Sequence, residues 1–185
     1  MALASTDLQE LARIVRRVDD RQQLAELLSR YGVAVDDRDF DTIAALFAVD
    51  GQFRHVKGRQ AVVDFYRERI AAYTASSHYA YTWHFDFDSD DRARGVVNGH
   101  AELCIDGKTI RIALRYLDQY VRTPSGWVFL VRDIQFRYVL PFDEVADGLA
   151  DPYRVRWPGT EPQLADLPDK LKTYLDSRPA PAVKA

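Results

Sequence analysis

The chain has 185 residues, of which 47% are hydrophobic and 29% are charged, a composition typical of one globular domain and not of a disordered or fibrous chain. The net charge is -3 and the basic residues are scattered, so no basic stripe suits a phosphate backbone and nucleic acid is not an expected partner. The single cysteine, Cys104, excludes an internal disulfide and favours a reducing cytoplasm as the location. The N-terminal segment lacks a long apolar run, which predicts no export signal and no membrane association.

Helical periodicity dominates the start of the chain. Thr6 and Asp20 each precede a glutamine by three residues, a spacing that predicts the start of one helix near Thr6 and of a second helix from Asp20 to about Asp36. Apolar residues recur at helical spacing along one face of each helix. These residues are Leu8, Leu11, Ile14, Val15 and Val18 in the first helix and Leu24, Leu27, Leu28, Tyr31, Ala34 and Val35 in the second.

Three shorter elements follow. Asp39 is a capping residue for a short helix over residues 40–47, and the pair Asp50-Gly51 predicts the turn that closes it. Residues 52–56 have the pattern of a short strand, and residues 60–74 have the period of a fourth helix.

The period then changes from helical spacing to two, which is typical of strands. The four long runs with this period cover residues 78–87, 93–105, 109–122 and 127–140. The segments between them are rich in turn residues, such as Asp106-Gly107, and indicate hairpins. Helices followed by an antiparallel meander predict an α+β fold, in which a curved, mostly antiparallel sheet wraps around the N-terminal helices as a cone-shaped barrel.

The organisation predicted along the chain is an N-terminal helix over residues 1–19, a barrel domain over residues 20–140 and a C-terminal extension over residues 141–185. Prolines punctuate this extension, and helical spacing returns only from Leu167 to Leu175. The last residues, 178–185, have the composition of a disordered end.

The segment from Tyr31 to Phe53 resembles the signature of SnoaL-like proteins, a branch of the nuclear transport factor 2-like superfamily. In that signature a helix ends in Tyr, an Asp follows five residues later, and an Asp-aromatic-Asp segment leads to an Asp-Gly-like turn. Three later features agree with it, namely His78 at a strand start, Arg115-Tyr116 with Asp118 and Arg122 in another strand, and Gly126-Trp127 at the start of the last. The resemblance covers residues 20–140 and implies a conical barrel with one deep pocket, in a homo-oligomer such as a dimer or trimer.

Within this branch the pattern is most similar to dehydratase-type and dehydrochlorinase-type members, among them scytalone dehydratase. Their helix-terminal Asp orients a His that shuttles protons, and Asp36 and His78 stand at the matching positions. An imidazole can take a proton from an activated C–H bond while a carboxylate fixes its tautomer. The alternative is that Asp36 only ends a helix and His78 only opens a strand.

Five further residues are candidates for binding substrate. Phe53 and His55 share one face of the short predicted strand, and Tyr116 and Asp118 share one face of a long strand. A phenol in a dry cone can hydrogen-bond a carbonyl or a developing enolate, although Tyr116 is equally suited to be a wall residue. His100 begins a polar row that faces either the pocket or a subunit contact.

No cofactor is expected. The histidines lack the close spacing of metal-binding motifs, so no metal ligands are assigned, and no glycine-rich phosphate-binding loop occurs. The function expected is a cofactor-independent lyase that acts on a hydrophobic, aromatic or polycyclic small molecule by elimination or retro-addition. An isomerase or polyketide-type cyclase with the same pair is the alternative enzyme, and a non-catalytic small-molecule binding module is the alternative from another class.

Overall fold

The computed structural model describes residues 5–168 and 171–177. Three helices and two short strands come before the long strands, where the sequence predicts four helices and one short strand. The helices are α1 (Ser5–Asp36), α2 (Phe40–Leu46), α3 (Arg59–Ala71), α4 (Val145–Gly148) and α5 (Lys172–Ser177), with a 3-10 turn at Phe142–Glu144. The strands are β1 (Phe47–Phe53), β2 (Val56–Lys57), β3 (Tyr73–Phe87), β4 (Arg92–Ile105), β5 (Lys108–Thr123) and β6 (Gly126–Pro141).

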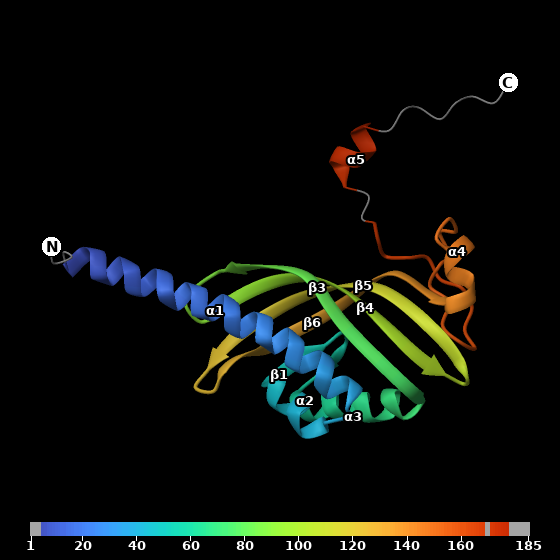
Figure 1. Ribbon diagram of the computed structural model, residues 1–185, viewed down its shortest axis with the longest axis horizontal. Coiled ribbons are helices and arrows are strands. Elements are labelled where there is room, and N and C mark those ends of the chain that lie inside the picture. The colour runs from blue at the N-terminus through green and yellow to red at the C-terminus, as the bar shows by residue number, and fades with distance from the viewer. Residues whose placement is uncertain (1–4, 169–170, 178–185) are drawn as a thin grey trace.

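The described strands form one curved sheet in the order β2-β1-β6-β5-β4-β3 (Figure 1). Every neighbouring pair is antiparallel except β1 and β6, which run parallel. The sheet is therefore mixed and does not close on itself. Helix α1 packs against β3 and β6 while α3 packs against β1, so the helices fill the open side of the cone. The α+β class and the cone of mostly antiparallel strands are confirmed.

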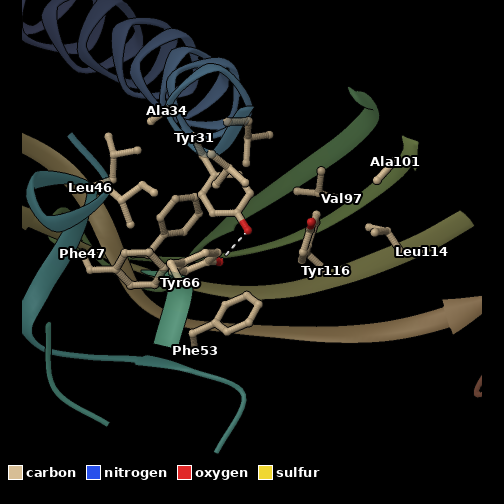
Figure 2. Close-up of a cluster of buried hydrophobic side chains, with 14 of the residues drawn as sticks. Tyr31, Ala34, Leu46, Phe47, Phe53, Tyr66, Val97, Ala101, Leu114 and Tyr116 are labelled. Carbon is tan, nitrogen blue, oxygen red and sulfur yellow. Dashed lines mark hydrogen bonds between the residues drawn. The ribbon is translucent and has the colours of Figure 1, made fainter. Parts of the chain in front are cut away.

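The core lies between the helices and the inner face of the sheet. Leu24, Leu27 and Leu28 of α1 are almost completely buried there, as are Ile110 of β5 and Phe129 of β6. Burial of each such side chain contributes about 1.5–3 kcal/mol. Figure 2 shows the part of this core around Tyr31, where aromatic side chains such as Phe47 and Tyr66 lie beside aliphatic ones such as Leu46 and Val97.

Helix α1 is continuous, and the prediction that a second helix starts at Asp20 is wrong. No glycine or proline interrupts residues 5–31, so nothing in this stretch breaks the helix. Asp20 is buried in the middle of α1, where its Oδ1 accepts a hydrogen bond from Trp127 Nε1 at 3.1 Å and another from the Arg122 guanidinium. The Asp20 carboxylate therefore accepts hydrogen bonds from side chains of the sheet and does not cap the start of a helix.

The N-terminal half of α1 projects beyond the sheet (Figure 1). Its apolar face is exposed to solvent, with relative exposures of 53% for Leu8, 49% for Leu11 and 63% for Val18. The helical period of these residues is as predicted, but within residues 5–168 and 171–177 no segment covers them.

Element boundaries differ from the prediction where turn residues lie inside strands. Residues 47–53 form β1 with Asp50-Gly51 in its interior, not the end of a helix and a turn. The cap at Asp39 is present, since its Oδ1 accepts from Thr42 N–H at 3.0 Å. The hairpin at Asp106-Gly107 is confirmed, and both residues have positive φ, 50° and 74°, as a two-residue turn of this kind requires.

The C-terminal extension folds back along β6. Val155 forms bridges with Val139 and Gln163, and the Arg154 guanidinium donates to the backbone oxygens of Arg137 at 2.7 Å and Leu167 at 2.6 Å. The last described element of the extension is α5, which begins later than the helix predicted over 167–175, and the predicted disordered end at 178–185 lies outside the described residues. In the part of the chain described, no helix has the length and apolar character needed to cross a membrane.

Candidate active site

The site begins where α1 meets β3. Asp36 is the last residue of α1, and His78 lies 42 residues further on in β3. His78 Nδ1 is 2.6 Å from Asp36 Oδ1, and the His78 backbone N–H donates to Oδ2 at 2.7 Å. Ser76 adds a third contact, because its Oγ donates to Oδ1 at 2.9 Å. The carboxylate is thus held from both of its oxygens.

Gly32 permits the close approach of the helix and the strand. A Cβ atom at this position would lie 3.1 Å from the backbone oxygen of His78, which is tighter than normal van der Waals contact. The glycine lets α1 approach β3 one helical turn before Asp36, and this approach brings the carboxylate to the imidazole.

The environment of Asp36 keeps it ionised. Partial burial alone would raise the pKa of this carboxyl, but hydrogen bonds from the His78 ring, the His78 N–H and the Ser76 hydroxyl, together with the charge of His78, outweigh burial and lower the pKa below its ordinary value. The side chains of His78 and Asp36 are 16% and 23% exposed. An ionised Asp36 makes Nδ1 of His78 the donor, so Nε2 of the neutral ring is free to accept a proton.

His78 is one of the residues that line a cavity inside the cone. Its walls are mainly apolar and aromatic. They come from α1, α3 and the inner face of the sheet, and include Val35, Phe53, Phe65, Ile70, Ala101, Leu103, Ile112, Leu114, Ile134 and Phe136.

Three phenols form one end of the cavity. The hydroxyl oxygens of Tyr31 and Tyr66 are 2.6 Å apart, and the ring of Tyr116 lies 6.0 Å from that of Tyr31 between centroids (Figure 2). Burial raises the pKa of each of these three phenols above its ordinary value. They therefore stay protonated. Because one hydroxyl of the Tyr31–Tyr66 pair donates to the other, the remaining phenol protons are the ones that can donate to an oxygen atom in the cavity.

A buried ion pair lies behind the phenols. The guanidinium carbon of Arg132 is 3.7 Å from the centre of the Tyr116 ring and 4.1 Å from that of Tyr31, and Arg132 Nε is 3.7 Å from Asp118 Oδ1. Tyr120 Oη donates to Asp118 Oδ2 at 2.7 Å. Burial raises the pKa of Asp118 to about 6, although the positive charge of Arg132 and the hydroxyl of Tyr120 act in the opposite direction.

Of the five residues predicted to bind substrate, two line the cavity and three lie away from it. Phe53 and Tyr116 line the cavity. Asp118 lies outside the lining, behind Tyr116. His55 is exposed in the turn between β1 and β2, and His100 packs against Tyr81 on the outer face of the sheet, with 5.1 Å between ring centroids.

The backbone explains the positions of the two histidines. Arg54 has a positive φ of 53°, which interrupts the strand between Phe53 and His55 and removes the alternation on which the prediction for His55 depended. Ala101 and Leu103 line the cavity, so period two turns His100 to the opposite face. Substrate contact by His55, His100 and Asp118 stays a prediction.

Sequence reasoning missed Ser76, Tyr31 and Tyr66 as site residues. Ser76 stands two residues before His78 on the same strand face, which is a usable signal. Tyr31 and Tyr66 have the spacing of core residues on their helices, and nothing in that spacing distinguishes a cavity wall from a core. In the described residues no group of three or more His, Cys, Asp or Glu side chains could hold a metal ion, and metal-free chemistry remains a prediction.

Solved structures similar to this chain share its fold. A putative scytalone dehydratase from Novosphingobium aromaticivorans is 17% identical, with a TM-score of 0.65 over 70% of this chain and 91% of its own. A hexachlorocyclohexane dehydrochlorinase, LinA-type3 from Novosphingobium barchaimii, is 20% identical, with a TM-score of 0.65 over 71% of this chain and 95% of its own. An NTF2-like protein with a cystatin-like fold from N. aromaticivorans is 26% identical, with a TM-score of 0.57 over 71% and 90%.

A search of curated protein sequences found no match. The family model of the SnoaL-like domain matches residues 16–133, which is more than half of the chain. This match agrees with the resemblance of the segment from Tyr31 to Phe53 and with the position of Asp36 at the end of α1. The chain belongs to the SnoaL-like family of the NTF2-like superfamily.

Proposed function

We propose that this protein is a lyase that removes a proton from a carbon atom of a mainly apolar small molecule, with His78 as the base and Asp36 as the residue that orients it. The observation that carries the proposal is the Asp36–His78 contact of 2.6 Å beside a cavity lined mainly by apolar side chains. A buried carboxylate that fixes the tautomer of an imidazole is a recurrent arrangement for proton transfer.

In the proposed reaction, Nε2 of His78 takes a proton from a carbon next to a carbonyl group. The electron pair of the C–H bond moves onto the carbonyl oxygen, and Asp36 stabilises the imidazolium that forms. The electron pair on the oxygen then restores the carbonyl group, and the carbon–carbon pair of the enolate forms a double bond to the next carbon as a leaving group departs from that carbon with its bonding electrons. His78 gives its proton to the leaving group.

The phenols support this chemistry. A carbonyl oxygen that gains negative charge needs donors that are already in place. Tyr31, Tyr66 and Tyr116 are neutral donors at one end of the cavity, and the positively charged Arg132 lies behind two of their rings. The same donors would serve an isomerase, in which the proton returns to another carbon and nothing leaves.

Hydrogen–deuterium exchange tests the proposal without knowledge of the substrate. A panel of aromatic and bicyclic ketones with an acidic C–H bond is incubated with the protein in D₂O, and loss of the C–H signal is followed by NMR. We expect catalysed exchange with wild-type protein and a loss of at least about 10²-fold in His78→Ala. His84→Ala is the matched control, because His84 is an exposed histidine on the same strand.

The outcomes separate the alternatives. Exchange followed by release of a leaving group from a suitable ketone supports the lyase, whereas exchange with migration of a double bond supports the isomerase. If ketones bind to wild type and to His78→Ala but neither protein catalyses exchange, the proposal is contradicted. The non-catalytic binding module is then the function that the results favour.

A further inference from the structure

The cavity opens into a second, outer cleft. Five residues line both spaces and so form the boundary between them: Arg54, Arg69, Tyr73, Phe136 and Trp157. The outer cleft continues along the C-terminal extension past Thr160, Gln163 and Asp166. A ligand that enters through this cleft passes two arginines before it reaches His78.

Both arginines lie against aromatic rings. The guanidinium carbon of Arg54 is 5.9 Å from the centre of the Phe136 ring, and that of Arg69 is 5.2 Å from the centre of the Trp157 ring. Stacking on a ring restrains a guanidinium while its N–H groups at the edge remain able to donate. Arg69 also interacts with the hydroxyl of Tyr73, which lowers the pKa of that phenol against the larger effect of burial.

The charge at this boundary is unbalanced. Among the described residues, neither Arg54 nor Arg69 forms an ion pair with a carboxylate, in contrast to Arg67 on the same helix, which is 3.0 Å from Asp64. One carboxylate, Asp166, lines the outer cleft, and its Oδ2 accepts a hydrogen bond from the Phe136 backbone N–H at 2.8 Å. The two guanidinium groups therefore carry two positive charges, while the lining of the outer cleft offers one carboxylate, which already accepts a hydrogen bond.

We propose that Arg54 and Arg69 form a carboxylate-binding site at the mouth of the cavity, and that the protein acts on small aromatic or bicyclic acids. The carboxylate of such a ligand would lie between the two guanidinium groups while its apolar body fills the cavity. The assignment of acids as substrates rests on the proposed function, whereas the binding site itself does not. A guanidinium suits this role because its planar set of donors matches the two oxygens of a carboxylate.

The site depends on parts of the chain that lie outside the family match. The match ends at residue 133, and both aromatic supports, Phe136 and Trp157, come after it. The extension is held in place by the bridges of Val155, and the rings of Phe136 and Trp157 are 5.7 Å apart between centroids. The proposed site thus combines Arg54 and Arg69 from inside the match with Phe136 of β6 and Trp157 of the extension.

Arg54 is held at the boundary by its backbone. It adopts a positive φ of 53°, a conformation that costs a residue other than glycine free energy. Its N–H donates to the backbone oxygen of Arg132 at 2.9 Å, so the turn after β1 is fixed to β6. This arrangement fixes where the Arg54 side chain starts, although the side chain itself is exposed.

The test compares acids with matched neutral amides. Benzoate, 2-naphthoate and anthracene-2-carboxylate are titrated into the protein by calorimetry at low ionic strength, each beside its primary amide. We expect the best-fitting acid to bind about tenfold more tightly than its amide, since a charge-assisted contact with arginine is stronger than a neutral one. The preference should shrink in 0.5 M salt, because the site is partly exposed.

Variants identify the residues responsible. The double variant Arg54→Gln/Arg69→Gln should lose the preference for the acid while its affinity for the amide stays within about twofold. Arg67→Gln is the matched control and should behave as wild type, because Arg67 lies outside both spaces. Equal affinities for acid and amide in wild type, no binding of any acid in the millimolar range, or a preference that survives in the double variant would each overturn the proposal.

The binding test is independent of catalysis, because these acids and amides cannot react by the proposed mechanism. A preference for acids in a protein that catalyses no exchange would support the carboxylate site and contradict the proposed function. Catalysed exchange in a protein that shows no such preference would do the opposite. To test the substrate class, the exchange panel includes each ketone with and without a carboxylate. In wild type the carboxylated ketone should exchange about tenfold faster than its neutral counterpart. In Arg54→Gln/Arg69→Gln the two ketones should exchange at the same rate.

Discussion

The Asp36–His78 pair and the Asp118–Arg132 pair of this cone differ in burial, in spacing and in the hydrogen bonds that the carboxylate accepts. Asp36 and His78 are partly exposed, stand 2.6 Å apart, and the carboxylate accepts further hydrogen bonds from Ser76 and the His78 backbone. Asp118 and Arg132 are almost completely buried, with 3.7 Å between Oδ1 and Nε. In the described structure, Asp118 Oδ1 and two nitrogens of Arg132 have no hydrogen-bond partner.

The difference shows that burial decides which carboxylate suits proton transfer and which has a structural role. Burial without enough donors raises the pKa of Asp118, while several donors lower the pKa of Asp36. A carboxylate that stays ionised beside a cavity can support an imidazolium, whereas a buried pair behind three aromatic rings mainly positions those rings. Substitutions at the two pairs test this division.

Replacement of Arg132 should have the largest effect on stability. Arg132→Met leaves the buried Asp118 without a positive partner and removes the guanidinium that packs on Tyr31 and Tyr116, which should cost about 3–5 kcal/mol in the free energy of unfolding. The double variant Asp118→Leu/Arg132→Met removes both charges and should regain most of this loss. Urea denaturation followed by circular dichroism measures both. A single variant that loses less than about 1 kcal/mol would show that the pair is not a structural element.

The free energy of unfolding should change with pH because the Asp118 carboxyl titrates at a higher pH in the folded state than in the unfolded state. Its pKa is raised to about 6 from an ordinary value of 3.8, so the folded state binds this proton more tightly than the unfolded state does. The stabilisation is complete below about pH 4 and is lost as the pH rises to about 6, by up to about 3 kcal/mol for a shift of this size.

The measurement is the unfolding free energy of wild type minus that of Asp118→Leu/Arg132→Met, at pH 4.5 and at pH 6.5. This difference should favour wild type more at pH 4.5, because both proteins share every other titrating carboxyl, Asp36 included. A difference that is equal at the two pH values, or larger at pH 6.5, would contradict the raised pKa of Asp118.

Replacement of Asp36 should affect catalysis far more than stability. An amide in Asp36→Asn cannot stabilise an imidazolium or enforce the Nδ1–H tautomer, so catalysed exchange should slow by about 10²-fold or more. Stability should change by about 1 kcal/mol or less, since the pair is partly exposed. Asp37→Asn, at an exposed neighbour, is the control. An unchanged exchange rate would make Asp36 a helix terminus only and favour the binding module.

The sequence predicts the elements of the Asp36–His78 pair well, because local signals position both residues. The signature from Tyr31 to Phe53 locates the end of α1, and the change from helical period to period two locates the strand that carries His78. Hairpin signals such as Asp106-Gly107 are local too. Their turn geometry depends on two adjacent residues, and the structure has the expected conformation there.

The sequence does not predict how deeply a side chain is buried in the fold. Tyr116 and Asp118 share one face of β5, yet one lines the cavity and the other is buried behind it, because the long strand runs past the end of the cavity. The partnership of Tyr31 with Tyr66 joins α1 to α3, and no local pattern records it. Asp20 shows the converse case, in which a local capping pattern is present but tertiary partners on β5 and β6 satisfy the side chain instead.

Ser76 should give the smallest effect and the sharpest test of how Asp36 is held. Its Oγ donates to Asp36 Oδ1 at 2.9 Å, the oxygen that also contacts His78 Nδ1. Ser76→Ala removes one donor and leaves the two from His78, so exchange should slow by about two- to tenfold, the value of one hydrogen bond of about 0.5–1.5 kcal/mol. Ser77→Ala is the matched control, because its side chain starts on the opposite strand face. A Ser76→Ala rate as low as that of Asp36→Asn would mean that the serine, and not the backbone N–H of His78, fixes the carboxylate. A rate equal to that of Ser77→Ala would mean that the two contacts from His78 suffice to orient Asp36.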